Sequence, residues 1–174
     1  IKNKNFYTYG QKNNSNFRIK NIRQFRSFSE FDLEVKLPNK NNSSIKDIRI
    51  PLLGIHNIRN TVAAIGVSLT VGIPIQKIKR GLKNFKGVQR RFNKIFSYKN
   101  VDFYDDYAHH PTEIRSILDG VNNAYKDRKI ISVFEPHRYS RVLSLKKEFA
   151  KSFKKSNLVL LCPLYAAGEK KNTN

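Results

Sequence analysis

The sequence predicts an α/β protein made of two parts, and two observations support this prediction. Residues 1–50 of the 174-residue chain contain short stretches in which apolar and charged residues alternate, as in half-buried strands. From residue 101 onward, apolar runs of strand length take turns with runs of helical spacing. Strand and helix in alternation imply a parallel sheet with right-handed crossovers.

The first part is expected to contain a β-hairpin. Residues 31–37 alternate strictly between apolar and charged side chains, which places one apolar face toward a core. A turn-rich loop over residues 38–44 follows, and the isoleucines of residues 45–50 offer a partner strand. Residues 2–16 are rich in asparagine and show no periodicity, so we expect either a loop or a frayed edge left by truncation there.

Two helices are expected after Gly54. Residues 57–69 have apolar side chains at helical spacing, with Asn57 placed as the N-cap. Pro74 suits the first turn of a second helix, and Gly87 is its expected stop. The apolar stripe of that second helix would consist of Ile75, Ile78, Leu82 and Phe85.

The second part is expected to begin with a strand over residues 101–105 and a helix over 111–125. A buried strand over 130–134, a helix over 142–155 and a strand over 158–162 follow. These repeated strand–helix units predict that residues 89–174 are the more autonomous half of the chain.

The chain carries a formal net charge of +21. Such a charge favours a polyanionic partner, so a basic nucleic-acid-binding module is one hypothesis for its function. The basic residues are spread from end to end, however, whereas a binding stripe should cluster on one face. We therefore expect no nucleic-acid partner.

No stretch reaches the roughly eighteen apolar residues of a membrane-spanning helix, and the first residues lack the apolar core of a secretory signal. We therefore expect a cytoplasmic protein without a membrane partner. The chain begins with Ile1 and contains no methionine, which predicts that the natural start is missing and that the chain is a fragment.

Three polar segments, residues 105–112, 135–141 and 163–169, follow the three strands expected in the second part. Ligands of open parallel sheets bind outside the carboxyl ends of the strands, so these loops are expected to share a site. Arg138 and Arg141 can converge on one anion beside His137, although an ordinary solvated basic loop is an equally good interpretation.

The segment DDYAHHPTEI, residues 105–114, is expected to turn the chain into a helix. Adjacent histidines point in different directions, so His109 and His110 do not predict a zinc site. Pro111 suits the first helical position, and Glu113 suits the positive end of the helix dipole. Asp106, at the end of a strand, lies where such folds hold ribose hydroxyls.

Six stretches of the chain resemble the Mur ligase family of peptidoglycan synthesis, in that family's order. They are residues 8–10, 54–64, 85–92, 105–114, 135–141 and 165–169. The forms DDYAHHPTE and EPHRYSR favour the alanine-adding members over the glutamate- or diaminopimelate-adding ones. The related recycling ligase, which joins a tripeptide to the same sugar acid, shares much of this pattern and stays open as an alternative.

The resemblance implies that residues 1–88 are the C-terminal part of a P-loop-type central ATPase domain, with a β-hairpin and helices. Residues 89–174 would be a truncated, Rossmann-like parallel α/β C-terminal domain that binds the amino acid. The implied reaction uses ATP and Mg²⁺ to join L-alanine to UDP-N-acetylmuramate through an acyl phosphate. A phosphate loop of the form GxxxxGK[ST] is absent from the 174 residues, and so is the domain that grips the UDP-sugar. We therefore expect the chain alone to lack ligase activity.

The resemblance also implies roles for individual residues. The positions matching the family's ATP site are Asn57 and Asn60 for adenine, Arg91 for the phosphates and Asp106 for the ribose. The positions matching the site of L-alanine are Tyr107, His137, Arg138 and Arg141, with the arginines on its carboxylate. His56 matches a residue near a magnesium ion, although magnesium prefers oxygen ligands. His109 receives no role.

Overall fold

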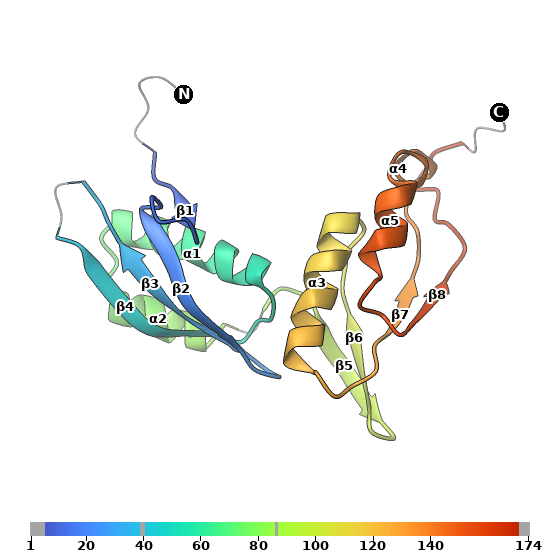
Figure 1. The fold of residues 1–174 in the computed structure, drawn as a ribbon, viewed down its shortest axis with the longest axis horizontal. Coiled ribbons are helices and arrows are strands. Elements are labelled where there is room, and N and C mark those ends of the chain that lie inside the picture. Colours follow the sequence, from blue (N-terminus) through green and yellow to red (C-terminus); the bar gives the residue numbers. More distant parts are fainter. Residues whose placement is uncertain (1–5, 39–40, 86, 171–174) are drawn as a thin grey trace. The chain divides into compact units, whose positions relative to one another are not determined.

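A computed structural model of the chain describes residues 6–38, 41–85 and 87–170 (Figure 1). The chain forms two compact units, Ile1–Val88 and Gln89–Asn174, and each is described by itself. The start of the loop expected over residues 2–16, part of the one over 38–44, and Lys86 before the expected helix stop lie outside the described residues.

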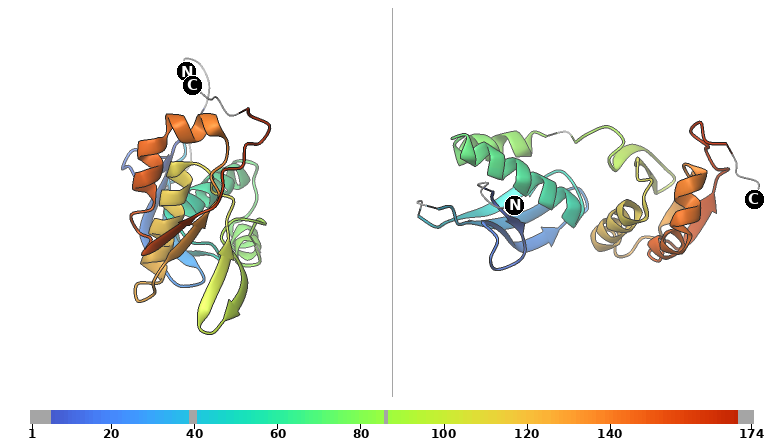
Figure 2. Two further views of the ribbon diagram at one scale, coloured as in Figure 1. Left: turned by 90° about the vertical axis from the view of Figure 1, so that its right-hand side faces the viewer. Right: turned by 90° about the horizontal axis from the view of Figure 1, so that it is seen from above.

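The first unit is a sheet covered on one face by two helices (Figure 1 and Figure 2). Its strands are β1 (Tyr9–Gly10), β2 (Phe17–Gln24), β3 (Ser29–Val35) and β4 (Ser43–Ile50), in that order across the sheet. β1 runs parallel to β2, whereas β2–β3 and β3–β4 are antiparallel. The helices are α1 (Ile55–Thr70) and α2 (Ile75–Lys83).

The predicted hairpin is confirmed, because β3 pairs with β4 and Phe31 lies opposite Ile48. Sequence periodicity missed β2, although Phe17 and Ile19 alternate with basic residues along it and are both buried. The expected loop over residues 2–16 contains the short strand β1, which adds to the edge of β2.

The start of α1 differs from the prediction. Gly54 is the N-cap, at a φ of 88° that favours glycine, and Asn57 lies inside the first turn. The Asn57 side chain donates Nδ2 to the Leu53 carbonyl at 2.8 Å, so it ties the helix back to the preceding chain. The expectation of an Asn57 N-cap is therefore wrong.

Both ends of α2 also differ from the prediction. Pro74 is the N-cap in an extended conformation, and Asn84 ends the helix before Gly87 is reached. Phe85 therefore lies beyond the helix and is 41% exposed, so it does not belong to the apolar stripe. Gly87 has a φ of 83° and belongs to the chain that leaves the unit.

The core of the first unit lies between the sheet and its helices. Gly66 of α1 faces the Phe17 ring so closely that a Cβ there would approach Cε2 to 3.1 Å, which allows helix and sheet to pack tightly. The buried apolar residues are Phe17, Ile19, Phe31, Leu33, Val35, Ile48, Ile50, Ile58, Val62, Ile65 and Ile78.

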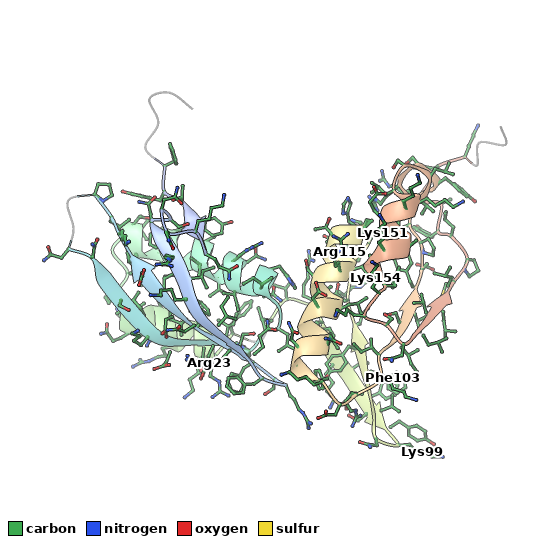
Figure 3. The ribbon with its side chains drawn as sticks, viewed as in Figure 1. Arg23, Lys99, Phe103, Arg115, Lys151 and Lys154 are labelled. Atoms are coloured by element: carbon green, nitrogen blue, oxygen red, sulfur yellow. The ribbon has the colours of Figure 1, made fainter. Side chains whose placement is uncertain are left out.

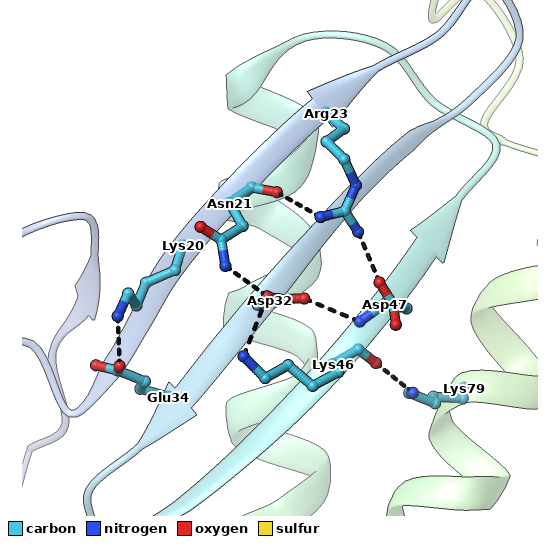
Figure 4. A network of polar contacts seen from close by, with 8 residues as sticks. All are labelled: Lys20, Asn21, Arg23, Asp32, Glu34, Lys46, Asp47 and Lys79. Carbon is cyan, nitrogen blue, oxygen red and sulfur yellow. Dashed lines mark hydrogen bonds and ion pairs between the residues drawn. The ribbon is translucent and has the colours of Figure 1, made fainter.

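A buried carboxylate organises the opposite face of this sheet (Figure 4). Asp32 is only 5% exposed, and it accepts hydrogen bonds from Asn21 Nδ2 at 2.7 Å and from the Asp47 backbone N–H at 3.0 Å. Asn21 and Asp47 have positive φ, and each lies where the strand register shifts opposite Asp32. Asparagine and aspartate tolerate this conformation better than most residues.

Over residues 89–170, the second unit contains two separate two-stranded sheets. Its elements are β5 (Asn93–Tyr98), β6 (Val101–Asp105), α3 (Pro111–Ala124), β7 (Ile131–Phe134), α4 (Tyr139–Ser144), α5 (Lys146–Ser152) and β8 (Leu158–Leu161). β7 and β8 are parallel, as predicted. β6 instead pairs in antiparallel fashion with β5, a strand that the sequence analysis missed. Among the described residues, the expectation that β6 shares one parallel sheet with β7 and β8 is therefore wrong.

Local backbone conformations explain two of these differences. Lys99 and Asn100 both have positive φ, which gives the tight two-residue turn between β5 and β6 at whose tip Lys99 lies (Figure 3). The helix expected over residues 142–155 is divided at Leu145, whose φ and ψ are −116° and 22°. No proline or glycine marks this break, so periodicity alone did not reveal it.

The described residues contain no helix that is both long and apolar enough to cross a membrane. The buried core of the second unit is small and lies between α3, β7 and α5. It consists of Ile114, Leu118, Phe134 and Phe149.

We expect Asp32→Ala to lower the free energy of unfolding by about 1–2 kcal/mol, because it removes the buried acceptor of two part-buried hydrogen bonds. The Asn21 amide, then the Asp47 N–H and Lys46, lower the pKa of Asp32 against the opposing effect of burial. This contribution is complete above about pH 4 and disappears as the pH falls through the lower pKa of the folded state. Urea unfolding at pH 7 and at pH 2–4 measures both effects.

The matched control for this substitution is Asp47→Asn. The Asp47 side chain is 72% exposed and pairs with Arg23, so its loss should cost less than about 1 kcal/mol. Equal effects of the two substitutions would contradict the role given to Asp32.

Limited proteolysis should cut the second unit before the first, because its core is smaller and its sheets are two-stranded. This outcome is the reverse of the one expected from the strand–helix pattern. Mass spectrometry of the first fragments decides between them, and early cuts confined to residues 6–85 would contradict the structural argument.

Candidate functional site

The loops that follow β7 and β8 are tied together by backbone hydrogen bonds. The Arg138 N–H donates to the Tyr165 carbonyl at 2.9 Å, and the Tyr165 N–H donates to the Pro136 carbonyl at 2.8 Å. His137 and Tyr165 thereby form an isolated parallel bridge beyond the strand ends. The parallel pairing of β7 and β8 thus continues into the polar loops.

The loop after β6 reaches the same place through a row of four rings. The Tyr107 and His109 ring centroids are 5.0 Å apart, those of His109 and His137 6.2 Å, and those of His137 and Tyr165 5.2 Å. His109 Nδ1 also lies 2.9 Å from the Tyr107 carbonyl oxygen. The three loops therefore meet, and His109, which had no expected role, lies at their centre.

Glu169 closes the site from the C-terminal side. Its carboxylate accepts from the Ser140 N–H at 3.0 Å and from the Ser140 hydroxyl at 2.7 Å, at the start of α4. The Ser140 backbone bond, followed by the Ser140 hydroxyl and the charge of Arg138, lowers the pKa of Glu169. Arg138 has a φ of 71°, an uncommon conformation for a residue with a side chain.

Two buried polar atoms in this site lack a hydrogen-bond partner among the described residues. They are His137 Nδ1 and Arg141 Nη1. Most buried polar atoms in folded proteins are hydrogen-bonded, and an exception often marks the place of a ligand or a water molecule. A guanidinium nitrogen can only donate, so a ligand that satisfies Arg141 must offer an acceptor such as a carboxylate.

The start of α3 confirms the expected helix N-terminus. Pro111 is the first helical residue, and His110 caps the helix by accepting the Thr112 N–H at Nδ1. Glu113 Oε2 accepts the backbone N–H groups of His109 and His110 at 3.1 and 3.2 Å. Burial raises the pKa of Glu113, but these N–H bonds and the charge of His109 outweigh it and lower the pKa overall.

Asp106 joins the loop after β6 to the segment that precedes β5. Its Oδ2 accepts the Phe92 N–H and its Oδ1 accepts the Ala108 N–H, each at 2.7 Å. Burial raises the pKa of Asp106, against the lowering effect of these two bonds and of the Arg91 charge. The exposed Arg91 is thus an electrostatic neighbour of Asp106.

Sequence reasoning assigned no role to several residues that shape this site: His109, Ser140, Tyr165 and Glu169. Their positions in polar loops directly after strands were the available signal. The contacts between these loops depend on how the strands pair, which a single sequence does not show.

The residues expected to bind adenine lie in the first unit, on α1. His56 and Asn57 are half-buried in its first turn, whereas Asn60 is exposed. Arg91 and Asp106 belong to the second unit. Within the described ranges, no group of three His, Cys, Asp or Glu side chains could hold a metal ion. Among the residues that the structure describes, His56 is therefore not part of a cluster of three such side chains, and its place near a magnesium ion stays a prediction.

Two protein-family models match the chain. The Mur ligase middle domain matches residues 1–68, and the Mur ligase glutamate ligase domain matches residues 90–173. The chain belongs to the Mur ligase family. Its first unit corresponds to middle-domain sequence, and its second unit to the glutamate ligase domain.

Two curated Mur ligases show high identity to this chain. It is 61% identical over 170 residues to the UDP-N-acetylmuramate–L-alanine ligase of Pelagibacter ubique, covering 98% of the chain and 37% of that protein. It is 43% identical over 169 residues to the enzyme of the same name from Brachyspira hyodysenteriae, covering 96% and 35%. The chain thus spans little more than a third of the length of these relatives.

A solved Mur ligase structure shows the same fold. The crystal structure of the UDP-N-acetylmuramate–alanine ligase of Thermotoga maritima aligns with a TM-score of 0.76 and 26% identity, over 93% of this chain and 35% of that one. A murein peptide ligase from Psychrobacter arcticus aligns with a TM-score of 0.51 and 19% identity, which shows the fold alone.

Asp106→Ala should expose the amides of Phe92 and Ala108 to solvent, because both lose their acceptor. Their hydrogen-exchange rates, measured by NMR, should rise at least tenfold. Asp105→Ala is the matched control, since Asp105 pairs with the exposed Arg90 side chain. Unchanged exchange in Asp106→Ala would show that the carboxylate does not hold these two segments together.

Proposed function

We propose that this chain forms the L-alanine-binding part, and a nucleotide-facing part, of an ATP-dependent ligase that joins L-alanine to UDP-N-acetylmuramate. The proposal is supported by the relatives with 61% and 43% identity, because both are named UDP-N-acetylmuramate–L-alanine ligase. Because this reaction consumes ATP and a UDP-sugar, the proposal places it in the cytoplasm.

The observation that best supports the proposal is the unpartnered Nη1 of Arg141. The carboxylate of an amino acid would accept from this buried donor and satisfy it. The Glu169 carboxylate, which approaches the start of α4, is already engaged by Ser140. The Arg141 donor therefore stays available for a carboxylate brought by a substrate.

We assign Arg141 and Arg138 to the alanine carboxylate, and His137 and Tyr107 to the space around it. Holding the carboxylate at Arg141 fixes one end of a small substrate and leaves its amine to approach the second substrate. The row of rings from Tyr107 to Tyr165 forms a wall beside it. This wall restricts the orientation of the bound amino acid.

In this proposal ATP supplies the phosphoryl group that activates the muramate carboxylate. Asn57 and Asn60 would face adenine, Asp106 the ribose and Arg91 the phosphates. The Asn57 amide donates to Leu53, which leaves its side-chain oxygen for a ligand. The described residues offer neither a phosphate loop nor a set of oxygen ligands for Mg²⁺, so these residues are assigned positioning roles only.

The proposed function can be tested in a chimera. Residues 1–174 replace the matching segment of the Pelagibacter ubique ligase, and phosphate release is measured with ATP, UDP-N-acetylmuramate and L-alanine. Turnover that depends on L-alanine is expected. Turnover with a tripeptide but not with L-alanine would favour the recycling ligase, and a folded chimera active with neither amine would overturn the proposal.

Arg141→Ala in the chimera should raise KM for L-alanine about 10- to 100-fold, the effect of losing charged hydrogen bonds worth about 1.5–3 kcal/mol. KM for ATP should change little. Arg115→Ala is the matched control, because Arg115 is exposed on α3 (Figure 3) and has no assigned role. Equal changes in both KM values would show that Arg141 acts on the structure rather than on alanine.

A further inference from the structure

The loop after β8 contains a tight turn that brings Glu169 to the start of α4. Ala167 and Gly168 have φ values of 50° and 84°, and the Glu169 N–H donates to the Ala166 carbonyl at 3.0 Å. Two successive residues with positive φ inside such a bond are characteristic of a type I′ turn. The turn directs the Glu169 side chain toward the segment that follows β7, where it meets Ser140.

Glu169 supplies the cap that α4 lacks at its own N-terminus. Arg138 is the N-cap residue, and its side chain makes no capping hydrogen bond. Glu169 Oε2 instead accepts the Ser140 N–H at 3.0 Å, and Oε1 accepts the Ser140 hydroxyl at 2.7 Å. A carboxylate that accepts an N–H group in the first turn stabilises a helix. Here the carboxylate comes from a residue 29 positions further along the chain.

The conformation of α4 depends on such contacts from outside the helix. α4 has six residues, and isolated helices shorter than about 12 residues are marginal in water. Arg138 has a φ of 71°, a conformation that persists only where the surrounding structure holds it. The Arg138 N–H donates to the Tyr165 carbonyl, and Ser140 donates to Glu169. The chain after β8 therefore holds the start of α4 at two points.

The position of Arg141 follows from the start of α4. The Arg138 carbonyl accepts the Val142 N–H at 3.2 Å, so the turn that carries Arg141 begins at Arg138. Arg141 Nη1 is buried and has no hydrogen-bond partner among the described residues. A helix turn that frays would therefore move the donor that is available to a ligand.

We propose that Glu169 is a positioning residue for the amino-acid substrate. Through Ser140 it holds α4 in the conformation in which Arg141 receives the substrate carboxylate. Ser140 in turn engages both oxygens of Glu169, so this carboxylate does not take the place of the substrate carboxylate at Arg141. This inference rests on the proposed function and adds a residue to which that function assigns no role.

The test measures phosphate release by the chimera that carries residues 1–174, with the concentration of L-alanine varied. Glu169→Ala should raise KM for L-alanine about fivefold, because losing a helix cap lowers the fraction of molecules in which α4 is formed. Bound L-alanine restores the helix, so kcat at saturating L-alanine and KM for ATP should each change less than about twofold.

Three further variants show whether Glu169 acts through Ser140. Glu169→Gln keeps an acceptor for the N–H and a donor for the hydroxyl oxygen, so KM for L-alanine should return to within about twofold of the parent. Ser140→Ala combined with Glu169→Ala should raise this KM no further than Glu169→Ala alone, since residues in one contact are not additive. Asp119→Ala is the matched control, because Asp119 is exposed in the middle of α3.

The outcomes separate this inference from the proposed function. A folded parent chimera without turnover that depends on L-alanine would overturn both. With an active parent, an unchanged KM for L-alanine in Glu169→Ala would overturn this inference alone, and so would additive effects of the two alanine substitutions. Equal increases in KM for L-alanine and for ATP would show general structural damage instead of positioning. Failure of Glu169→Gln to restore KM would assign the effect to charge and contradict the role of the hydrogen bonds.

Discussion

Parallel hydrogen bonding between β7 and β8 places the polar loops of the second unit in one location. The pairing extends past the strands through His137 and Tyr165, so the residues that follow each strand cannot separate. Arg138 takes a left-handed backbone conformation at this point and donates its N–H to Tyr165. The row of rings and the buried Nη1 of Arg141 then follow from where the loops are held.

Two aspartates show how the environment, rather than the residue type, sets the role of a carboxyl group. Asp32 receives enough hydrogen bonds and positive charge to overcome burial, so its pKa falls. Asp106 also accepts two backbone N–H groups, yet burial dominates and its pKa rises. Asp32 is stabilised as an anion in a structural network. Asp106 holds two segments together, although its carboxylate loses hydration through burial.

Local sequence patterns predicted the elements that depend on neighbours along the chain. The alternation around Phe31 predicted β3, and the His110-Pro111 pair with Glu113 predicted the start of α3. Errors arose where the backbone took a special conformation. Gly54 displaced Asn57 as the N-cap, Leu145 divided a helix, and the left-handed Lys99 and Asn100 created a hairpin that periodicity did not reveal.

The sequence by itself determined the family, the order of most elements and the identity of the polar loops, because motifs and periodicity are local properties. Only the tertiary structure decided which strands pair. It separated β6 from β7, set His109 between Tyr107 and His137, and left the Arg141 donor buried without a partner among the described residues. Strand pairing and the meeting of loops are contacts between distant residues, and their geometry is fixed by packing and backbone hydrogen bonds that no single stretch of sequence contains.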